Sequence, residues 1–171
     1  DSSVTKTSGD VYNIDPFVTY VNPTNNDKHR LQSRYMKVIN DNATKNDPTG
    51  QDNQSTTYYS EYQYQKTFEG IQLNWTSGIL NEYVDAEAEL FDGKNFRLNQ
   101  AIFTQLDKKI GQRINLSLGA RFERFSLKTS ESYVIEGDTI NSFQVEKPVF
   151  RAGVNYQLAK ATFLRSSWGQ G

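Results

Sequence analysis

Charged side chains recur at every second position inside segments that are otherwise aliphatic and aromatic. Arg121 and Glu123 stand in one such segment, and Arg151 stands in another that covers 149–157. A guanidinium or a carboxylate in such a place binds an oppositely charged group through charge-assisted hydrogen bonds, which are roughly twice as strong as neutral ones. The candidates that share this polar side are Arg30, Arg34, Glu61, Arg121, Glu123, Arg151 and Arg165.

The residue types needed for catalysis or for metal binding are scarce. His29 is the only histidine and the chain has no cysteine, which excludes a Cys–His nucleophile pair and a thiolate zinc site. The sequence has no nucleophile-elbow motif and no glycine-rich phosphate loop. The acidic stretch from 82 to 92 fits no calcium-loop spacing and is better explained as a solvated loop. We therefore expect a protein that is not an enzyme, with no catalytic residue, no cofactor and no bound metal.

Composition indicates a folded chain in which apolar and polar residues are mixed. Hydrophobic residues make up 36% of the 171 residues, the mean hydropathy is −0.73, and 13% of the residues are aromatic. Disordered chains are poor in aromatic residues, so the low hydropathy does not indicate disorder. The formal net charge of −1 excludes a chain-wide basic surface for nucleic acid. The length suits one domain, which we place over residues 1–171.

A hydrophobic period of two residues runs through almost the whole chain. From Ile114 to Phe122 every second residue is apolar, and the residues between them are polar or small. Such alternation is typical of a β-strand with one apolar and one polar side. The same pattern, stronger or weaker, predicts about eight strands and no helix. The predicted strands cover 11–21, 29–39, 56–66, 71–79, 95–107, 114–125, 149–157 and 161–169.

The connections between these strands alternate between short and long. The short ones contain turn residues, as in Asn22–Asp27 and Thr67–Gly70. The longer ones are rich in Asp, Asn, Thr, Gly and Glu and cover 40–55, 78–95 and 128–146. Because short and long links alternate, all the long ones are expected at one end of an up-and-down antiparallel sheet.

This arrangement is typical of a transmembrane β-barrel with short periplasmic turns and long extracellular loops. Lipid offers the backbone no hydrogen-bond partner, so a sheet that spans the membrane must pair its strands and close on itself. We therefore predict an all-β fold, an antiparallel up-and-down transmembrane β-barrel segment. No run of apolar residues approaches the roughly 18 that a membrane-spanning helix needs. Aromatic residues near strand ends fit the interfacial girdles of such barrels: Tyr12, Tyr20, Tyr58, Tyr156 and Trp168.

Two other folds with the same period stay open. One is a complete, small outer-membrane barrel with a structural or adhesive role, since about eight strands can close around an interior filled by side chains. The other is a soluble eight-stranded carrier, which would turn its apolar side inward around a ligand. The soluble carrier predicts high solubility without detergent, whereas the membrane barrel predicts aggregation or detergent dependence.

Two groups of residues form longer motifs than simple alternation. Asn99–Gln105 ends in aromatic-x-Gln, and Ile114–Glu123 then alternates before Gly-x-Arg-aromatic-acid. Ala161–Gly171 carries an arginine ahead of Gly-x-Gly. Both motifs resemble those of TonB-dependent outer-membrane receptors of the Bacteroidetes type. The resemblance covers the strands of most of the chain, while the long loops match no motif of that family.

In that family, a barrel of about 22 strands surrounds an N-terminal plug domain. The resemblance implies that residues 1–171 supply about eight of these strands, without the plug, in the outer membrane of a Gram-negative bacterium. It also implies import of a scarce, bulky ligand of the siderophore, cobalamin or glycan class, driven through TonB by rearrangement of the plug. The implied partners are outer-membrane lipid, the plug, TonB through the plug and the imported small ligand.

The resemblance also suggests roles for the polar residues. The charged set on the polar side either lines a ligand path or holds the plug, and its structural alternative is mutual pairing within the barrel wall. We favour wall and plug contacts over ligand contact. Ligand recognition is then expected from the long loops, with Tyr83, Asp85, Glu87 and Phe91 as the candidates.

Overall fold

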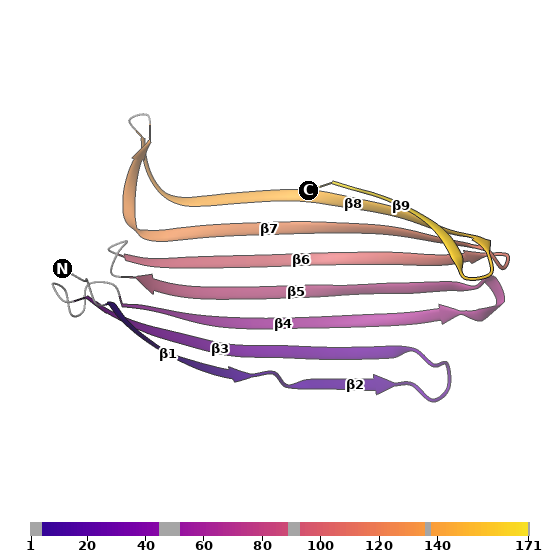
Figure 1. The fold of residues 1–171 in the computed structure, drawn as a ribbon, viewed down its shortest axis with the longest axis horizontal. Helices are drawn as coiled ribbons and strands as arrows, with labels where there is room; N and C mark the ends of the chain where they lie inside the picture. The colour runs from indigo at the N-terminus through magenta and orange to yellow at the C-terminus, as the bar shows by residue number, and fades with distance from the viewer. Residues whose placement is uncertain (1–4, 45–51, 89–92, 136–137, 171) are drawn as a thin grey trace.

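One antiparallel β-sheet accounts for nearly all of the described chain (Figure 1). The structure is a computed structural model and describes residues 5–44, 52–88, 93–135 and 138–170. Its elements are β1 (Thr5–Ile14), β2 (Phe17–Val21), β3 (Lys28–Thr44), β4 (Asn53–Phe68), the 3₁₀ turn η1 (Glu69–Ile71), β5 (Leu73–Ala88), β6 (Gly93–Ile110), β7 (Ile114–Ile135), β8 (Asp138–Ala159) and β9 (Thr162–Gly169). In this part of the chain, no helix is long and apolar enough to cross a membrane.

The strands follow one another across the sheet in chain order, and each is antiparallel to its neighbours. β1 and β2 both pair with β3, so they are the two halves of one interrupted strand. The interruption falls at Asp15 and Pro16, because proline has no N–H to donate to the ladder. The Ser33 N–H still donates to the Pro16 carbonyl at 2.9 Å, which continues the pairing past the break. The predicted up-and-down antiparallel fold is confirmed, with its first strand split in two.

The strands are longer than the alternation indicated. β7 and β8 are each 22 residues long, whereas about 9–11 tilted residues cross the hydrocarbon. The extra length falls in segments predicted as long loops: β5 continues to Ala88, and β6 begins at Gly93. The prediction of a loop over 78–95 is therefore wrong for most of that range. Where a strand leaves the lipid, water reaches both of its sides, so the period of two fades while the strand pairing persists.

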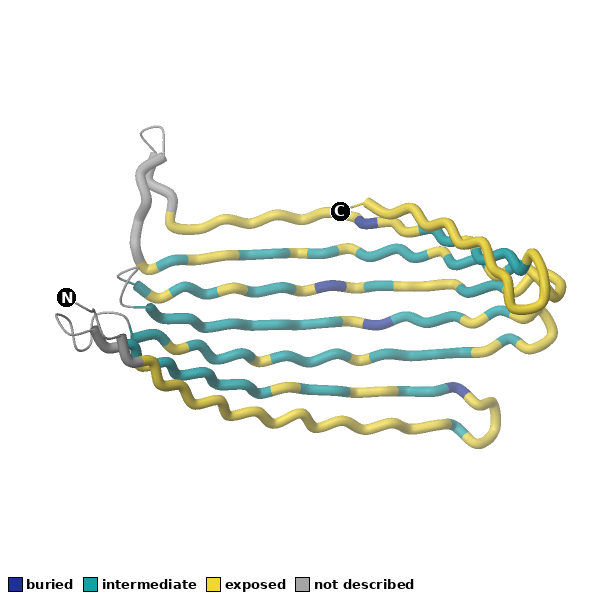
Figure 2. Tube along the Cα trace, in the orientation of Figure 1, coloured by how far each residue is buried: buried dark blue, intermediate teal, exposed yellow. Residues whose placement is uncertain are grey.

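The sheet is a single layer without a hydrophobic core of its own (Figure 2). Among the described residues, only Asp27, Gly78, Ala101 and Val149 are buried. Large apolar side chains such as Ile79 and Leu118 leave 57% and 56% of their surface exposed. An exposed apolar layer of this extent needs an apolar medium, and membrane lipid supplies one.

The sheet is open at both edges. β1 and β9 lie at its opposite borders and do not pair with each other (Figure 1). The described sheet therefore differs from a closed eight-stranded barrel, which is one of the alternatives that the sequence leaves undecided. Each border strand presents unpaired N–H and C=O groups, to which a further strand can add.

A buried carboxylate fastens the turn between β2 and β3. Asp27 accepts hydrogen bonds from the Tyr64 hydroxyl at 2.9 Å and the Lys66 ammonium at 3.2 Å, while its backbone oxygen accepts one from the Asn22 N–H at 2.8 Å. Burial raises the pKa of Asp27, but the hydrogen bonds from Tyr64 and Lys66 outweigh burial and hold the pKa below its ordinary value. These hydrogen bonds connect the turn predicted over 22–27 to β4.

We expect Asp27→Ala to loosen this turn. Tyr64 and Lys66 lose their shared acceptor, so amide exchange over 22–27 should speed up by about tenfold. Because the pKa of Asp27 is lowered in the folded chain, its stabilising effect is complete above the unfolded-state pKa and is lost as pH falls through the folded-state pKa. The protection of the unaltered turn, measured as its exchange rate relative to an unstructured chain at the same pH, should therefore also fall in acid. Equal exchange rates for the variant and the unaltered chain at neutral pH would contradict this expectation.

Candidate functional site

The register of the strands defines two faces of the sheet. Residues paired across neighbouring strands point to the same side, and consecutive residues in one strand point to opposite sides. One row of paired residues is apolar: Val18, Leu31, Tyr62, Ile79, Ile102, Phe122 and Pro148. The adjacent row on the other side is Thr19, Arg30, Gln63, Gly78, Phe103, Arg121 and Val149. We call these two sides the apolar face and the charged face.

Aromatic side chains border the apolar face at two levels. Towards the short turns, a cluster with ring centres 5.2–5.9 Å apart joins neighbouring strands through Tyr20, His29, Tyr64 and Trp75. Towards the opposite end, a second row with ring centres 5.4–6.4 Å apart consists of Tyr35, Tyr58, Tyr83 and Phe96. Aromatic rows on both sides of an apolar band match the interfacial girdles of membrane barrels. Two of the residues predicted for such girdles, Tyr20 and Tyr58, belong to these rows.

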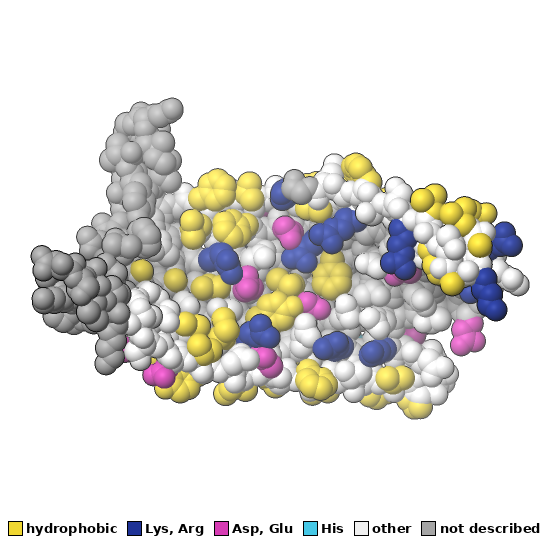
Figure 3. All heavy atoms as spheres, viewed as in Figure 1, with side chains coloured by type: hydrophobic (Ala, Val, Ile, Leu, Met, Phe, Trp, Pro, Cys, Tyr) yellow, Lys and Arg dark blue, Asp and Glu magenta, His cyan; other side chains and the backbone are white. Residues whose placement is uncertain are grey.

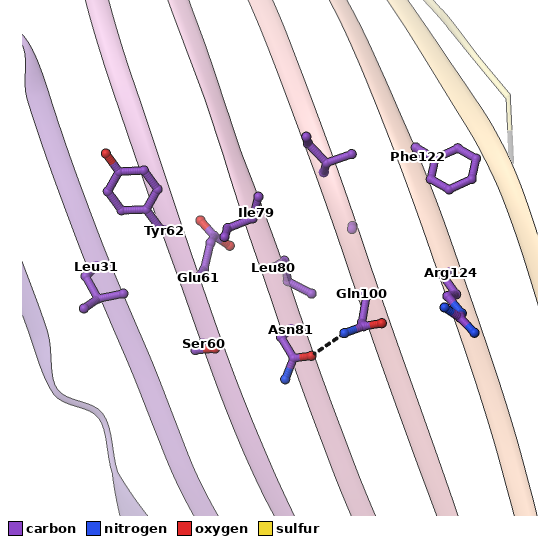
Figure 4. A pocket seen from close by; sticks show the side chains of 12 residues that line it. Leu31, Ser60, Glu61, Tyr62, Ile79, Leu80, Asn81, Gln100, Phe122 and Arg124 are labelled. Carbon is purple, nitrogen blue, oxygen red and sulfur yellow. Dashed lines mark hydrogen bonds between the residues drawn. The ribbon is translucent and has the colours of Figure 1, made fainter.

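The apolar band has a defined outer limit. Figure 4 shows part of this face, from Leu31 in β3 to Phe122 in β7. At its border the Gln100 amide donates a hydrogen bond to Asn81 Oδ1 at 3.1 Å (Figure 4). Arg124 follows Phe122 on the same side of β7. Because amide and guanidinium groups are costly in hydrocarbon, the lipid layer ends at this level.

The charged residues predicted to share a polar side all lie on the charged face. The register places Arg151 beside Gly119 and Arg165 beside Asn155, on the same side as Arg121. Figure 3 shows this face, where Lys and Arg side chains are interspersed with Asp and Glu over the middle of the sheet. An arginine facing lipid at the bilayer centre would cost about 2–4 kcal/mol, so the charged face is the inner wall of the barrel.

Some of these charges pair within the wall. Arg34 Nε lies 2.6 Å from Asp15 Oδ1, and a second nitrogen of Arg34 donates to Asp15 Oδ2 at 3.1 Å. Arg121 forms an ion pair with Glu123. In ion pairs of this kind the two side chains neutralise each other within the wall, so little charge remains to bind a partner.

Two further interactions extend the paired region of the charged face. Glu61 accepts a 2.5 Å hydrogen bond from the Tyr59 hydroxyl. Arg97 donates to Glu82 at 3.0 Å, a pair that the sequence analysis missed. Arg97 and Glu82 fall in a segment where the alternation is weak, and only the register of β5 with β6 shows that they face one another.

Among the residues that the structure describes, the other arginines of the predicted set have no carboxylate partner. Arg30 lies over the ring of Phe17, 5.9 Å from its centre. Within the described part of the chain, Arg151 and Arg165 form no ion pair. The structure therefore divides the predicted charges into a self-paired group and a group that is free to bind something else.

Three of the four residues predicted as loop contacts for a ligand lie in a strand and not in a loop. Tyr83, Asp85 and Glu87 belong to β5, and they share the side of the apolar face. Tyr83 is part of the outer aromatic row, and Glu87 forms an ion pair with Lys94 at 3.5 Å. Phe91 lies outside the described residues. The prediction of a loop at these residues is wrong because β5 extends past the lipid layer as a paired strand.

An apolar patch on the charged face was missed by the sequence analysis. Phe125 pairs with Val145, and Leu127 pairs with Phe143, so their side chains share one side of β7 and β8. Phe143 is 55% exposed and Val145 is 41% exposed. These residues lie beyond the level at which Arg124 ends the apolar band. A signal was present in the sequence, because apolar residues here occupy the positions that are polar earlier in the same strand.

Among the described residues, no three His, Asp or Glu side chains are grouped so as to hold a metal ion. The chemistry of the charged face is therefore that of ion pairs, hydrogen bonds and apolar contact. These interactions suit the binding of a protein segment or an organic ligand.

Comparison with known proteins gives the following relationships. The sequence matches the family described as "TonB dependent receptor-like, beta-barrel" over residues 2–171. A search of curated proteins found no match. Among solved structures, the ferric-catecholate import receptor Fiu of E. coli K12 in its closed form is similar, with a TM-score of 0.73 and 10% identity over 99% of this chain and 33% of that chain. Its open form has a TM-score of 0.69 and 10% identity over 99% of this chain and 36% of that one.

The alcaligin outer-membrane receptor FauA of Bordetella pertussis is also similar. Its TM-score is 0.67, with 13% identity over 96% of this chain and 29% of that chain. This chain thus spans about a third of the solved structures that it matches. At this identity the structural likeness shows a common fold, and the family match extends over almost the whole sequence. The chain therefore belongs to the TonB-dependent receptor-like β-barrel family, as a barrel segment in the outer membrane of a Gram-negative bacterium.

Proposed function

We propose that this chain is part of an active-transport receptor that imports a scarce, bulky ligand by TonB-coupled rearrangement of a plug domain. The observation that carries the proposal is the contrast between the two faces of a single layer. One face is apolar with aromatic borders, and the other carries paired and unpaired charges. Such a wall suits lipid outside and a polar interior. In this proposal the chain has no catalytic role.

The ligand class is the second part of the proposal. Fiu is a ferric-catecholate import receptor and FauA is an alcaligin receptor. We propose a ligand of the siderophore class for this chain as well, and cobalamin and glycans are the other ligand classes to be tested. The partners in this proposal are outer-membrane lipid, the plug domain and, through the plug, TonB.

We place the ligand contact of this segment on the inner apolar patch, which consists of Phe125, Leu127, Phe143 and Val145. The patch lies beyond the lipid level and faces the interior, where an entering ligand would meet it. Arg97 pairs with Leu127 across β6 and β7, but its guanidinium is already ion-paired with Glu82. The patch therefore offers apolar contact, which suits an organic ligand with exposed apolar groups.

Uptake by cells tests the proposed function. Cells that carry the complete receptor gene, and cells that lack it, are given radiolabelled ferric siderophores, cobalamin or oligosaccharides. We expect one of these classes to accumulate only in cells that have the gene, and accumulation should stop when the proton gradient is collapsed with an uncoupler. Equal accumulation of all three classes with and without the gene would overturn the proposal.

The double variant Leu127→Ser/Phe143→Ser tests the ligand patch. Loss of two apolar side chains from a contact surface should raise the Kd for the accumulated ligand by about tenfold to a hundredfold. Leu98→Ser is the matched control, because Leu98 stands next to Arg97 in β6 but points to the outer side. Kd values measured on purified complete receptor should rise for the double variant alone. Equal Kd values for the double variant and the control would mean that the patch does not contact the ligand.

A further inference from the structure

The part of the inner wall nearest the short turns carries positive charge without a carboxylate to balance it. Arg151 in β8 and Arg165 in β9 form no ion pair within the described residues. Both side chains lie on the charged face, and both residues are exposed. From the strand register, their Cα atoms lie roughly 14 Å apart.

The carboxylates nearest to these arginines are already engaged. Asp107 accepts hydrogen bonds from the Ser117 hydroxyl at 2.6 Å and from the Gln105 amide at 2.8 Å. Glu123 forms its ion pair with Arg121. Within the part of the wall that the structure describes, the two arginines therefore have no carboxylate partner, and an arginine in a confined interior is stabilised by an oppositely charged group.

An unsatisfied acceptor lies beside Arg165. Asn155 Oδ1 is buried and accepts no hydrogen bond from the described residues. Asn155 pairs with Arg165 across β8 and β9 and points to the same face. A buried acceptor without a donor is costly, so a rotation of the Asn155 side chain that lets this oxygen accept an N–H from outside the wall would be favourable.

The residues around Arg151 are small although the wall does not need them to be small. Gly119, Gly153 and Gly169 surround it on the charged face. A Cβ added at any of the three would meet its nearest wall atom at 3.4–3.8 Å, an ordinary contact. None of the three has a positive φ angle. Neither backbone conformation nor packing within the sheet therefore requires glycine at these positions.

At two other positions of the chain, by contrast, the structure does require glycine. A Cβ on Gly78 would lie 2.6 Å from Cζ of Phe103 and 2.4 Å from the Tyr62 backbone oxygen. Gly111 has a φ angle of 57° in the turn between β6 and β7. A glycine inside a strand without either reason marks a place where another backbone approaches closely. The cluster of Gly119, Gly153 and Gly169 leaves room for that approach.

We propose that this surface of β7–β9 docks a carboxylate-bearing segment of the plug domain, with its backbone close against the glycines. Asp or Glu side chains of that segment bind Arg151 and Arg165, and a backbone N–H donates to Asn155 Oδ1. The proposal rests on the proposed function, since it needs a plug inside the barrel. Charge complementarity selects the occupant: a basic segment would be repelled by the two arginines, and a bulky one would not reach the Asn155 oxygen.

Protease digestion of the complete receptor tests the docking surface. The variants are Arg151→Gln/Arg165→Gln, which removes the charges, and Gly119→Leu, which fills the space. Lys160→Gln is the charge control, because Lys160 lies in the turn after β8 and forms no ion pair among the described residues. Ala120→Leu is the size control, because Ala120 follows Gly119 but points to the lipid side. Heat-dependent gel mobility reports separately whether the barrel is folded.

We expect proteinase K to cleave the plug about tenfold faster in both variants than in the unaltered receptor, with unchanged barrel mobility and unchanged cleavage in both controls. Arg151→Lys with Arg165→Lys should restore part of the protection, because the charge is kept. Equal plug cleavage in all receptors with folded barrels would overturn the docking surface. Loss of ligand affinity without faster plug cleavage would also overturn it and would assign the arginines to the ligand path.

The same experiment separates this inference from the proposed function. If the unaltered receptor contains no protected plug fragment, the proposed function fails. If the unaltered plug is protected and the two variants protect it equally well, only the docking surface fails.

Discussion

Leu118→Arg is expected to prevent stable assembly of the barrel in the outer membrane. Leu118 lies in the middle of the apolar face of β7, between Leu116 and Ala120, and 56% of its surface is exposed. Its cross-strand neighbours on the same side are Leu106 and Ala152. An arginine there would face hydrocarbon and cost about 2–4 kcal/mol near the bilayer centre. That cost is a large part of the usual stability of a folded domain.

The measurement is the fraction of complete receptor in outer membranes that keeps the faster gel mobility of a folded barrel. We expect this fraction to fall by at least about tenfold for Leu118→Arg. Gln105→Arg is the matched control, because Gln105 points to the charged face and pairs with Gly119, the residue after Leu118. Its new guanidinium would lie on the same side as the Asp107 carboxylate. If both variants assembled equally well, the assignment of the apolar face to lipid would be wrong.

The second large effect concerns residues 1–171 on their own. We expect this segment to have no persistent amide protection in detergent-free water. The sheet has two open borders at β1 and β9, and its described part has almost no buried side chains. An apolar face of this size would associate with other copies before it could fold stably.

Hydrogen exchange followed by mass spectrometry measures this directly. Exchange of β5 and β6 should be complete within the dead time of the experiment for the isolated segment, and slow for the same strands in the complete receptor. Slow exchange in the isolated, monomeric segment would contradict the expectation. That result would favour the soluble eight-stranded carrier, which is the alternative fold that predicts folding without detergent.

Fold class was readable from the sequence because it depends on local repetition. The alternation from Ile114 to Phe122 alone predicts a strand with two unlike sides, since side-chain direction in a strand depends only on position within that strand. The same argument placed Arg121, Arg151 and Arg165 on one side of the sheet before any pairing was known. The family motifs at 99–105 and 114–123 then predicted the kind of barrel, and the family match confirmed it.

Strand length was not readable in the same way. Tyr83 and Asp85 lie in β5, although their surroundings resemble a polar loop. Alternation reports a difference between the media on the two sides of a strand, so it vanishes where water reaches both sides. Pairing with β4 and β6 continues there because the backbone hydrogen bonds do not depend on side-chain polarity.

Which charges neutralise one another was decided only by the tertiary structure. Arg34 and Asp15 are far apart in sequence, and the break at Pro16 together with the register of β2 and β3 brings them to 2.6 Å. Arg151, like Arg34, is an arginine on the charged face, yet its cross-strand neighbours are Gly119 and Gly169. The alternation of one strand determines the side to which a residue points, whereas the register between strands determines what it meets there, because the pairing partners come from distant parts of the chain.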